Sequence, residues 1–213
     1  MDLVSHVKSC LSTVRSGTKR LPYEIHTYPG YSGSYTREFY NLICSIKNVS
    51  YLEIGTWQGS SSISALYGNT VNATFIDNWS EFNGDKNTLI QSLEKYKGNS
   101  TYTLIESDCW NVDVASLPQY DVYLYDGAHT YDDHYKAIVK YWPCLKNKAI
   151  IMVDDWNWTD SVKAGTMDAF RDIGATILFS EEITLRPDET EYMPYHKGRH
   201  TWWNGIGIFV ISK

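Results

Sequence analysis

The chain has 213 residues, of which 43% are hydrophobic and 21% are charged, a composition that excludes a disordered or fibrous protein. This length predicts one domain spanning residues 1–213, with residues 1–40 as an N-terminal cap segment. No apolar run approaches the roughly 18 residues that a membrane helix needs, and the first residues do not resemble a secretion signal. We therefore expect a cytoplasmic protein that does not bind membranes.

The formal net charge of −6 disfavours nucleic acid as a partner, because affinity for a phosphate backbone comes largely from Lys and Arg. The 4 cysteines lie far apart and form no Cys-x-x-Cys pair, which predicts free thiols and neither a zinc knuckle nor a disulfide framework. Aromatic residues make up 15% of the chain, including 17 Tyr and 8 Trp. This exceeds the usual need of a core, so we expect some of them to line a pocket.

Short apolar runs rich in β-branched and aromatic residues alternate with segments of helical periodicity. Apolar runs without polar alternation are typical of strands that are covered on both faces of a parallel sheet. We expect such strands at residues 51–54, 73–76, 102–105, 122–125 and 149–153. We expect helices at 60–67, 86–96, 131–145 and 161–173. The alternation predicts an α/β, Rossmann-like, doubly wound sheet.

Two further strands are expected at 176–183 and 205–211, after the alternating part of the chain. They would close the sheet as an antiparallel pair and bring it to seven mostly parallel strands. Between them lies a long segment, 186–204, with aromatic residues and no apolar periodicity. Loops of this length are usually functional or disordered, and the aromatic content favours a substrate-side loop.

The residues after the first strand read Glu53-Ile-Gly55-Thr-Trp57-Gln-Gly59-Ser-Ser61. Ligands of open parallel sheets bind beyond the carboxyl ends of the strands, where these residues fall. The glycines allow a tight turn, and the start of the next helix can bind an anion through its free N–H groups. A dinucleotide fingerprint would have glycine in place of Trp57, so NAD is disfavoured.

Aspartates follow the second and third strands. Asp77 lies about 24 residues after Glu53, the position from which a carboxylate takes the ribose hydroxyls in nucleoside-binding sheets. Asp108 ends the third strand and is followed by Cys109 and Trp110. An isolated aspartate after a strand is often a helix cap or a turn residue, and this alternative applies to each of them. Their combination with the glycine turn favours a nucleoside site.

Three more aspartates follow the fourth and fifth strands, namely Asp126, Asp154 and Asp155. Adjacent parallel strands would bring their carboxylates to one rim, where they would repel one another. A hard divalent cation would relieve that repulsion, and oxygen ligands predict Mg²⁺, or Ca²⁺ or Mn²⁺, in preference to zinc. Alternatively, one of the three caps the following helix or is solvated in the loop.

The combined pattern resembles the class I S-adenosylmethionine-dependent methyltransferases. The resemblance rests on Glu-x-Gly-x-x-x-Gly-x-Ser at the first strand, the acids after the second and third, and Asp-Gly-Ala-His at the fourth. The stretch Asp-Gly-x-His-x-Tyr and the later Asp-Asp are similar, more narrowly, to metal-dependent bacterial O-methyltransferases of sugars and antibiotics, distant relatives of catechol O-methyltransferase. The similarity runs from about Tyr51 to Trp158.

The resemblance implies that S-adenosylmethionine is the cofactor. It implies that the turn residues shape the cofactor site, that Ser61 holds the methionine carboxylate, that Asp77 takes the ribose hydroxyls, and that Asp108 and Trp110 flank the adenine. The residues assigned to the cofactor are Glu53, Gly55, Gly59, Ser61, Asp77, Asp108, Trp110 and Asp126.

The resemblance also implies that Asp126, Asp154 and Asp155 hold the metal and that His129 is the catalytic base. In the catechol enzymes the third ligand is Asn and the base is Lys, so this chain departs from them at both positions. The metal would lower the pKa of an acceptor hydroxyl, and His129, with an unperturbed pKa near 6.5, would remove the proton. His134, one turn further on, is expected on the helix surface.

These observations predict methyl transfer to a hydroxyl of a small polar acceptor, such as a sugar or a phenol-like molecule, and they leave homo-oligomerisation open. One alternative is a metal-independent methyltransferase of the same fold. Another is a non-catalytic protein that uses the scaffold to bind a carbohydrate or a partner protein. For His129, the alternative to catalysis is a structural hydrogen bond in a loop.

Overall fold

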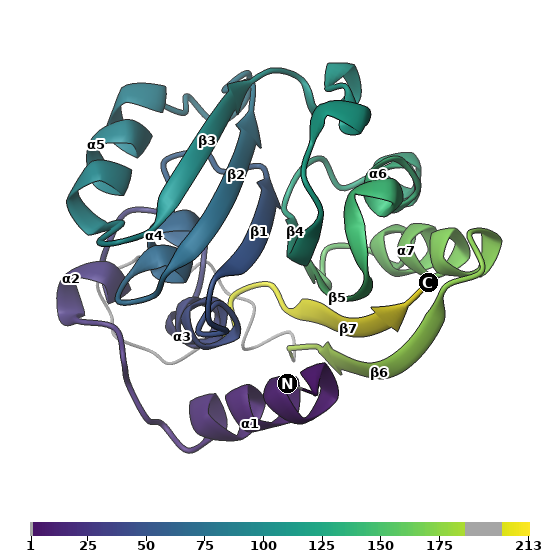
Figure 1. Ribbon diagram of the computed structural model, residues 1–213, viewed down its shortest axis with the longest axis horizontal. Helices are drawn as coiled ribbons and strands as arrows, with labels where there is room; N and C mark the ends of the chain where they lie inside the picture. The colour runs from purple at the N-terminus through teal and green to yellow at the C-terminus, as the bar shows by residue number, and fades with distance from the viewer. Residues whose placement is uncertain (1, 186–201) are drawn as a thin grey trace.

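The computed structural model describes residues 2–185 and 202–213, which form a three-layer α/β structure around one seven-stranded sheet (Figure 1). The strand order is β3-β2-β1-β4-β5-β7-β6. The strands are β1 (Val49–Ile54), β2 (Val71–Asp77), β3 (Thr101–Glu106), β4 (Tyr120–Tyr125), β5 (Leu145–Asp154), β6 (Thr176–Ile183) and β7 (Ile206–Ser212).

Strand directions confirm the predicted sheet. The neighbours among β1 to β5 pair in parallel, whereas β7 pairs antiparallel with both β5 and β6. Ile54 at the end of β1 is in register with Ile76 of β2 and Tyr125 of β4. The carboxyl ends of these central strands therefore lie at one edge of the sheet, as expected from the sequence.

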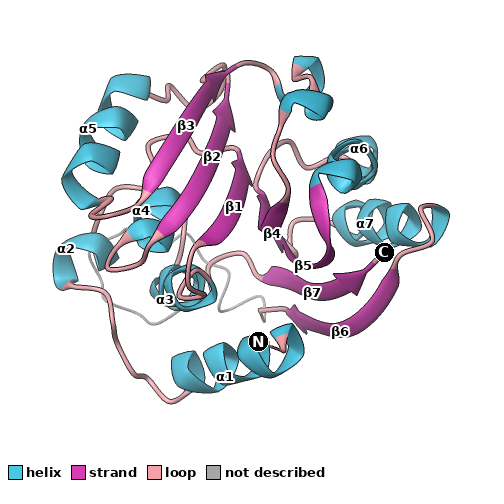
Figure 2. Cartoon of the chain, in the orientation of Figure 1, coloured by secondary structure: helices cyan, strands magenta, loops and turns pink. Residues whose placement is uncertain are grey.

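Helices cover both faces of the sheet, with α6 and α7 on one face and α1, α3 and α4 on the other (Figure 2). The helices are α1 (Leu3–Arg15), α2 (Tyr23–His26), α3 (Ser34–Ile43), α4 (Ser60–Leu66), α5 (Lys86–Tyr96), α6 (Tyr131–Tyr141) and α7 (Asp160–Asp172). In the described ranges, no helix combines the length and the apolar character that crossing a membrane would require. All four cysteines are free thiols, as predicted.

Two hydrophobic cores lie on opposite faces of the sheet because side chains alternate along each strand. In β1, for example, Tyr51 packs into the core under α3 and α4, and Leu52 packs into the core under α6 and α7. Both positions need apolar residues, which explains the continuous apolar runs. The helix expected at 131–145 ends at Tyr141, and a 3₁₀ turn containing Pro143 follows it.

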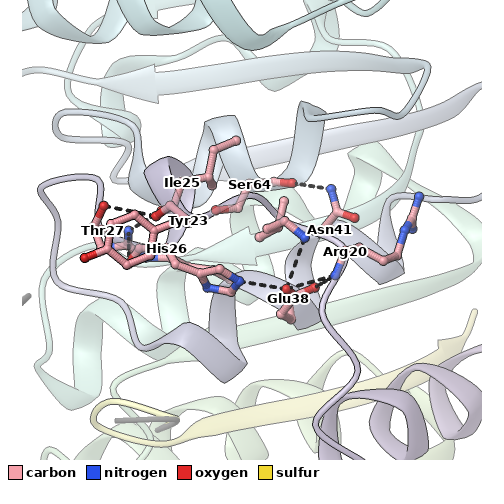
Figure 3. Close-up of polar contacts among 10 residues, drawn as sticks. Arg20, Tyr23, Ile25, His26, Thr27, Glu38, Asn41 and Ser64 are labelled. Carbon is pink, nitrogen blue, oxygen red and sulfur yellow. Dashed lines mark hydrogen bonds and ion pairs between the residues drawn. The ribbon is translucent and has the colours of Figure 1, made fainter. Parts of the chain in front are cut away.

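The N-terminal cap segment is organised by a buried carboxylate, Glu38 of α3 (Figure 3). Glu38 accepts hydrogen bonds from the backbone N–H groups of Arg20 and Leu21, and its Oε1 lies 2.8 Å from Nε2 of His26. Burial raises the pKa of Glu38, but the hydrogen bonds from His26 and from these backbone amides outweigh burial and lower it. One side chain thus joins the connection after α1 to α2 and α3.

A second polar contact ties α3, which begins in this segment, to α4. Nδ2 of Asn41 donates to the carbonyl oxygens of Ser64 and Tyr67, at 2.8 and 2.7 Å. These carbonyls belong to α4 and its C-cap, and α4 is the helix that follows the glycine turn of β1. The cap segment therefore fixes the helix that borders the predicted site.

The turn after β1 brings two backbone segments unusually close together. Gly55 has φ of +85°, and a Cβ atom built on it would lie 1.8 Å from the carbonyl oxygen of Asp126. The backbone N–H of Asp126 in turn donates to the carbonyl of Ile54 at 2.9 Å. Only glycine satisfies both the left-handed backbone and the contact.

Replacing Gly55 by alanine should destabilise the fold much more than the same change at Gly68. Gly68 also has a positive φ, +67°, but no atom lies within 4 Å of a Cβ built there. We expect Gly68→Ala to lose about 1–2 kcal/mol from the left-handed conformation alone. Gly55→Ala should lose about 1–3 kcal/mol more from the clash. Urea unfolding measures both, and equal losses would contradict the account of this turn.

The Glu38 network predicts a pH-dependent contribution to stability. The folded-state pKa of Glu38 lies below its ordinary value of 4.5, so the contribution is complete above about pH 4.5 and is lost as pH falls through the lowered pKa. We expect Glu38→Gln to reduce the free energy of unfolding by about 1–3 kcal/mol near neutral pH. The difference from the unmodified protein should shrink in acid. Glu24→Gln, an exposed change on α2, is the matched control and should have little effect.

Candidate functional site

A pocket of about 870 Å³ lies beyond the carboxyl ends of the central strands. This volume is in the range of small-molecule sites. Its walls include the turn after β1, the loops after β2, β3, β4 and β5, and the segment before β7. The predicted site residues that line it are Gly55, Asp77, Asp108, Trp110, Asp126, His129 and Asp155.

Glu53 and Ser61 lie behind the pocket and bind each other. Glu53 is buried and accepts hydrogen bonds from the hydroxyls of Ser61, Ser62 and Tyr51, at 2.6, 2.9 and 2.8 Å. Burial raises the pKa of Glu53 to about 7, although the three hydroxyls oppose this shift. The Ser61 hydroxyl is thus directed at Glu53, and its role toward a methionine carboxylate stays a prediction.

Gly59 also lies outside the pocket lining, immediately before α4. It has φ of +94°, and a Cβ atom there would lie 2.5 Å from Cδ1 of Leu89 in α5. Gly59 thus allows α4 and α5 to approach each other, and its role in a cofactor turn stays a prediction.

Asp77 holds two loops together at the end of β2. Its carboxylate accepts hydrogen bonds from the backbone N–H groups of Trp57 and Trp79, both at 2.7 Å. The indole N–H of Trp79 donates to the carbonyl of Trp57, and that of Trp57 donates to the carbonyl of Phe82. Trp57, Trp79 and Phe82 all have left-handed backbones, with φ of +44°, +51° and +53°. Such conformations cost about 1–3 kcal/mol each and persist only where surrounding contacts impose them.

Asp108 both caps a turn and lines the pocket, the two roles considered for it from sequence. Its Oδ1 accepts from the backbone N–H of Trp110 at 2.9 Å, which caps the short 3₁₀ turn Cys109–Asn111. Both Asp108 and Trp110 also line the pocket. A capping residue is therefore also in position to contact a ligand.

Asp154 and Asp155 are neighbours in sequence but have different partners. Asp154, the last residue of β5, is buried and accepts from the hydroxyl of Tyr40 at 3.1 Å. Burial and the charge of Asp155 raise the pKa of Asp154 to about 7. Asp155 has φ of +52°, and its Oδ2 lies 2.8 Å from Nε2 of His129. The left-handed turn thus directs the two carboxylates to separate neighbours.

This arrangement does not support the predicted metal ligand set of Asp126, Asp154 and Asp155. Within residues 2–185 and 202–213, no three His, Cys, Asp or Glu side chains are gathered in a way that could hold a metal ion. Burial raises the pKa of Asp126 well above its ordinary value, and the charges of Asp154 and Asp155 raise it further. Asp126 and Asp155 line the pocket, whereas Asp154 is not part of the lining and accepts a hydrogen bond from Tyr40.

His129 lies in the loop between β4 and α6 and faces Asp155. Burial lowers the pKa of His129, but its hydrogen bond to Asp155 and the charge of that residue outweigh burial and raise it. The ring of His129 is 5.1 Å from that of Trp158, between centroids. His129 thus makes the hydrogen bond that a structural role would require. Its partner, Asp155, also lines the pocket.

His134 is buried, which corrects the expectation that it lies on the helix surface. It stands on the sheet-facing side of α6, where its ring packs edge-on against Tyr125 at 5.0 Å between centroids. Burial lowers the pKa of His134 to about 4, so it is neutral at physiological pH.

Aromatic side chains from distant parts of the chain form the rim of the pocket. The Tyr31 ring lies 4.9, 6.1 and 6.2 Å from the rings of Trp57, Phe82 and Trp203, between centroids. Aromatic pocket residues were expected from the composition, and the turn at 29–34, which contains Tyr31, was expected to cover the acceptor, but Phe82 was not singled out. The aromatic run directly after Asp77 was the available signal. Of the predicted substrate-side loop 186–204, Trp203 and Asn204 line the pocket, and residues 186–201 lie outside the described part of the chain.

Comparison with known proteins agrees with this architecture. Residues 52–156 match a protein-family model for a methyltransferase domain. The O-methyltransferase TomG from Streptomyces achromogenes, involved in tomaymycin synthesis and solved in complex with S-adenosylmethionine, superimposes with a TM-score of 0.60 at 12% identity, covering 100% of both chains. The chain has the class I S-adenosylmethionine-dependent methyltransferase fold.

Other structures share this methyltransferase fold at similarly low identity. A protein from Pyrococcus horikoshii assigned as an RNA methyltransferase has a TM-score of 0.55 at 13% identity, covering 97% of each chain. A protein from Streptococcus mutans assigned as an S-adenosylmethionine-dependent methyltransferase has a TM-score of 0.55 at 16% identity, covering 84% of this chain and 47% of that one. The chain thus spans about half the length of the latter. Among curated proteins, none matches the chain by sequence.

If Asp77 takes the ribose hydroxyls, Asp77→Asn removes a charge-assisted acceptor and should weaken binding of S-adenosylhomocysteine by about tenfold or more. Calorimetry measures the dissociation constant, and near-ultraviolet circular dichroism reports whether the Trp57 and Trp79 loops stay in place. The matched control is Asp132→Asn on the exposed face of α6, which should leave the affinity unchanged. An unchanged affinity in Asp77→Asn would refute the ribose assignment.

Proposed function

We propose that this protein transfers a methyl group from S-adenosylmethionine to a hydroxyl of a small polar acceptor, such as a sugar or a phenol. The observation that carries the proposal is the position of the His129–Asp155 pair. It lines the same pocket as Asp77 and Asp108, in a chain with the methyltransferase fold. A group able to take a proton is thus next to a region with the features of a nucleoside site.

Three features of the cofactor half of the pocket support S-adenosylmethionine as its ligand. Gly55 provides a turn without a side chain, Asp77 provides a carboxylate at the end of β2, and Trp110 provides an aromatic wall. The acidic lining also favours a cofactor that carries a positively charged sulfonium. When bound, the cofactor supplies an electrophilic methyl group.

The acceptor half is proposed to contain His129 and Asp155. The acceptor hydroxyl would lie against this pair, which takes up the proton as the oxygen attacks the methyl group. The pair would end as an imidazolium beside a carboxylate, held by the 2.8 Å contact between Nε2 and Oδ2. A positioned general base contributes about 10²–10⁴ in rate. Holding the reactants together in a closed site contributes more.

No step of this proposal uses the divalent cation expected from sequence. Asp154 is bound to Tyr40, and Asp155 is bound to His129, so the three aspartates do not present a ligand set. Nucleic acid is also disfavoured as the acceptor, because among the described residues that line the pocket none is Lys or Arg. This holds although the Pyrococcus horikoshii protein is assigned as an RNA methyltransferase.

Both His129→Ala and Asp155→Asn should lower the rate of methyl transfer by about 10²–10⁴ while leaving S-adenosylhomocysteine binding almost intact. The assay follows a labelled methyl group from S-adenosylmethionine into a panel of sugars, phenols and nucleic acids. Asp132→Asn should retain full activity as the control.

Each result of this assay discriminates among the alternatives. A fully active His129→Ala enzyme would show that His129 is not the base and has a structural role instead. Transfer to nucleic acid alone would overturn the small-molecule acceptor. Cofactor binding without transfer to any acceptor would favour the non-catalytic protein. Activity that disappears in chelator and returns with Mg²⁺ would show that the aspartates rearrange around an ion.

A further inference from the structure

Arg37 of α3 is an arginine buried inside the N-terminal cap segment, with 1% of its surface exposed. Its Nη1 is hydrogen-bonded to the carbonyl oxygens of Ile25, His26 and Tyr28, at 2.7, 3.2 and 2.7 Å. Its Nε donates to the carbonyl and hydroxyl oxygens of Ser32, at 3.1 and 2.9 Å. The planar guanidinium offers five donors in a fixed fork, so one side chain holds the connection between α2 and α3 at several points.

The same connection is also pressed against Ser60, the first residue of α4. A Cβ atom built on Gly30 would lie 2.2 Å from Cβ of Ser60. The hydroxyl of Ser32 lies 3.0 Å from that of Ser60. Nη2 of Arg37 lies 3.4 Å from the carbonyl oxygen of Gly30. The backbone of Tyr31, between Gly30 and Ser32, is therefore fixed on both sides.

The side chain of Tyr31 extends from this fixed backbone into the pocket lining. Tyr31 is 42% exposed, and its ring lies 4.9 Å from that of Trp57, between centroids. The backbone N–H of Trp57 donates to the carboxylate of Asp77 at 2.7 Å. Direct contacts thus lead from Arg37, through Tyr31 and Trp57, to the residue assigned to the ribose.

We propose that Tyr31 contacts the cofactor beside Asp77 and that Arg37 is the positioning residue that holds Tyr31 there. The inference rests on the proposed function, because its ligand is the cofactor of that reaction. A tyrosine ring presents a large apolar face to a nucleoside, and a ring that is already in place loses little freedom when the ligand binds. The N-terminal cap segment then builds one wall of the binding site, in addition to covering the sheet.

Calorimetry with S-adenosylhomocysteine tests the contact and its support. We expect Tyr31→Ala to weaken binding by about threefold or more, because an aromatic wall is lost. Arg37→Lys keeps the positive charge but not the fork of donors, and it should weaken binding by a similar factor. Arg171→Lys, the same change at an exposed position of α7, is the matched control and should leave the affinity unchanged.

A double variant separates positioning from a general loss of stability. If Arg37 acts through Tyr31, then Arg37→Lys should cost little further affinity in a protein that already carries Tyr31→Ala, because the two losses share one cause. Losses that multiply in the double variant would refute the positioning role. Thermal unfolding establishes that each variant is folded at the temperature of the titration.

A spectroscopic signature reports the position of Tyr31 without any ligand. The ring pair of Tyr31 and Trp57 contributes to near-ultraviolet circular dichroism, and Tyr31→Ala defines that contribution. Arg37→Lys should reproduce part of the same change, and Arg171→Lys should not. An unchanged spectrum in folded Arg37→Lys would show that Tyr31 is held by other contacts, which would overturn the role of Arg37.

Gly30→Ala provides an independent variant, should Arg37→Lys fail to fold. Its added methyl group would push the connection away from Ser60 while leaving the guanidinium in place. We expect the same loss of affinity and the same spectral change as in Arg37→Lys.

The two proposals fail in different ways. An unmodified protein that does not bind S-adenosylhomocysteine would refute the proposed function and the cofactor contact together. Binding and methyl transfer that persist unchanged in Tyr31→Ala would refute this inference and leave the proposed function standing.

Discussion

The site depends on a contact between two backbones, in which the carbonyl of Asp126 occupies the space beside Gly55 that a side chain would otherwise fill. Hydrogen bonds from Gly55 to Ile76 and from Asp126 to Ile54 continue the parallel ladder past the ends of the strands. The loops after β1 and β4 consequently start from a fixed separation. One loop leads through Gly59 into α4 and the other carries His129, so this contact sets how far apart these two walls of the pocket lie.

Much of the fold was predictable because buried parallel strands leave a distinct pattern. Strands covered on both faces must be apolar at every position, and those runs marked the sheet. The helix α3 was not predicted, because several residues that it buries are polar, including Thr36, Arg37, Glu38 and Asn41. The hydrogen-bond partners of Arg37, Glu38 and Asn41 lie elsewhere in the sequence, at α2, the connection after α1 and α4, respectively. Helix prediction from the spacing of apolar residues cannot detect a helix that buries polar side chains.

The site was predictable to the extent that strand ends determine it. Asp77, Asp108, Asp126 and His129 line one pocket because parallel strands end at the same edge of the sheet. Neither the direction of Asp154 nor the hydrogen bond of Ser61 follows from that rule. Both depend on local features, the left-handed backbone of Asp155 and the buried carboxylate of Glu53, which the residue pattern does not specify.

The left-handed residues of the pocket also bear on how this protein could be engineered. Trp57, Phe82, Asp155 and Trp203 all have positive φ values and all line the pocket. Glycine at any of these positions would relieve backbone strain, yet it would remove an aromatic wall or a carboxylate. Selection for heat resistance alone would therefore tend to erode the pocket before the rest of the fold. Stabilising changes are better sought in the N-terminal helices, none of whose residues belongs to the described lining of the pocket.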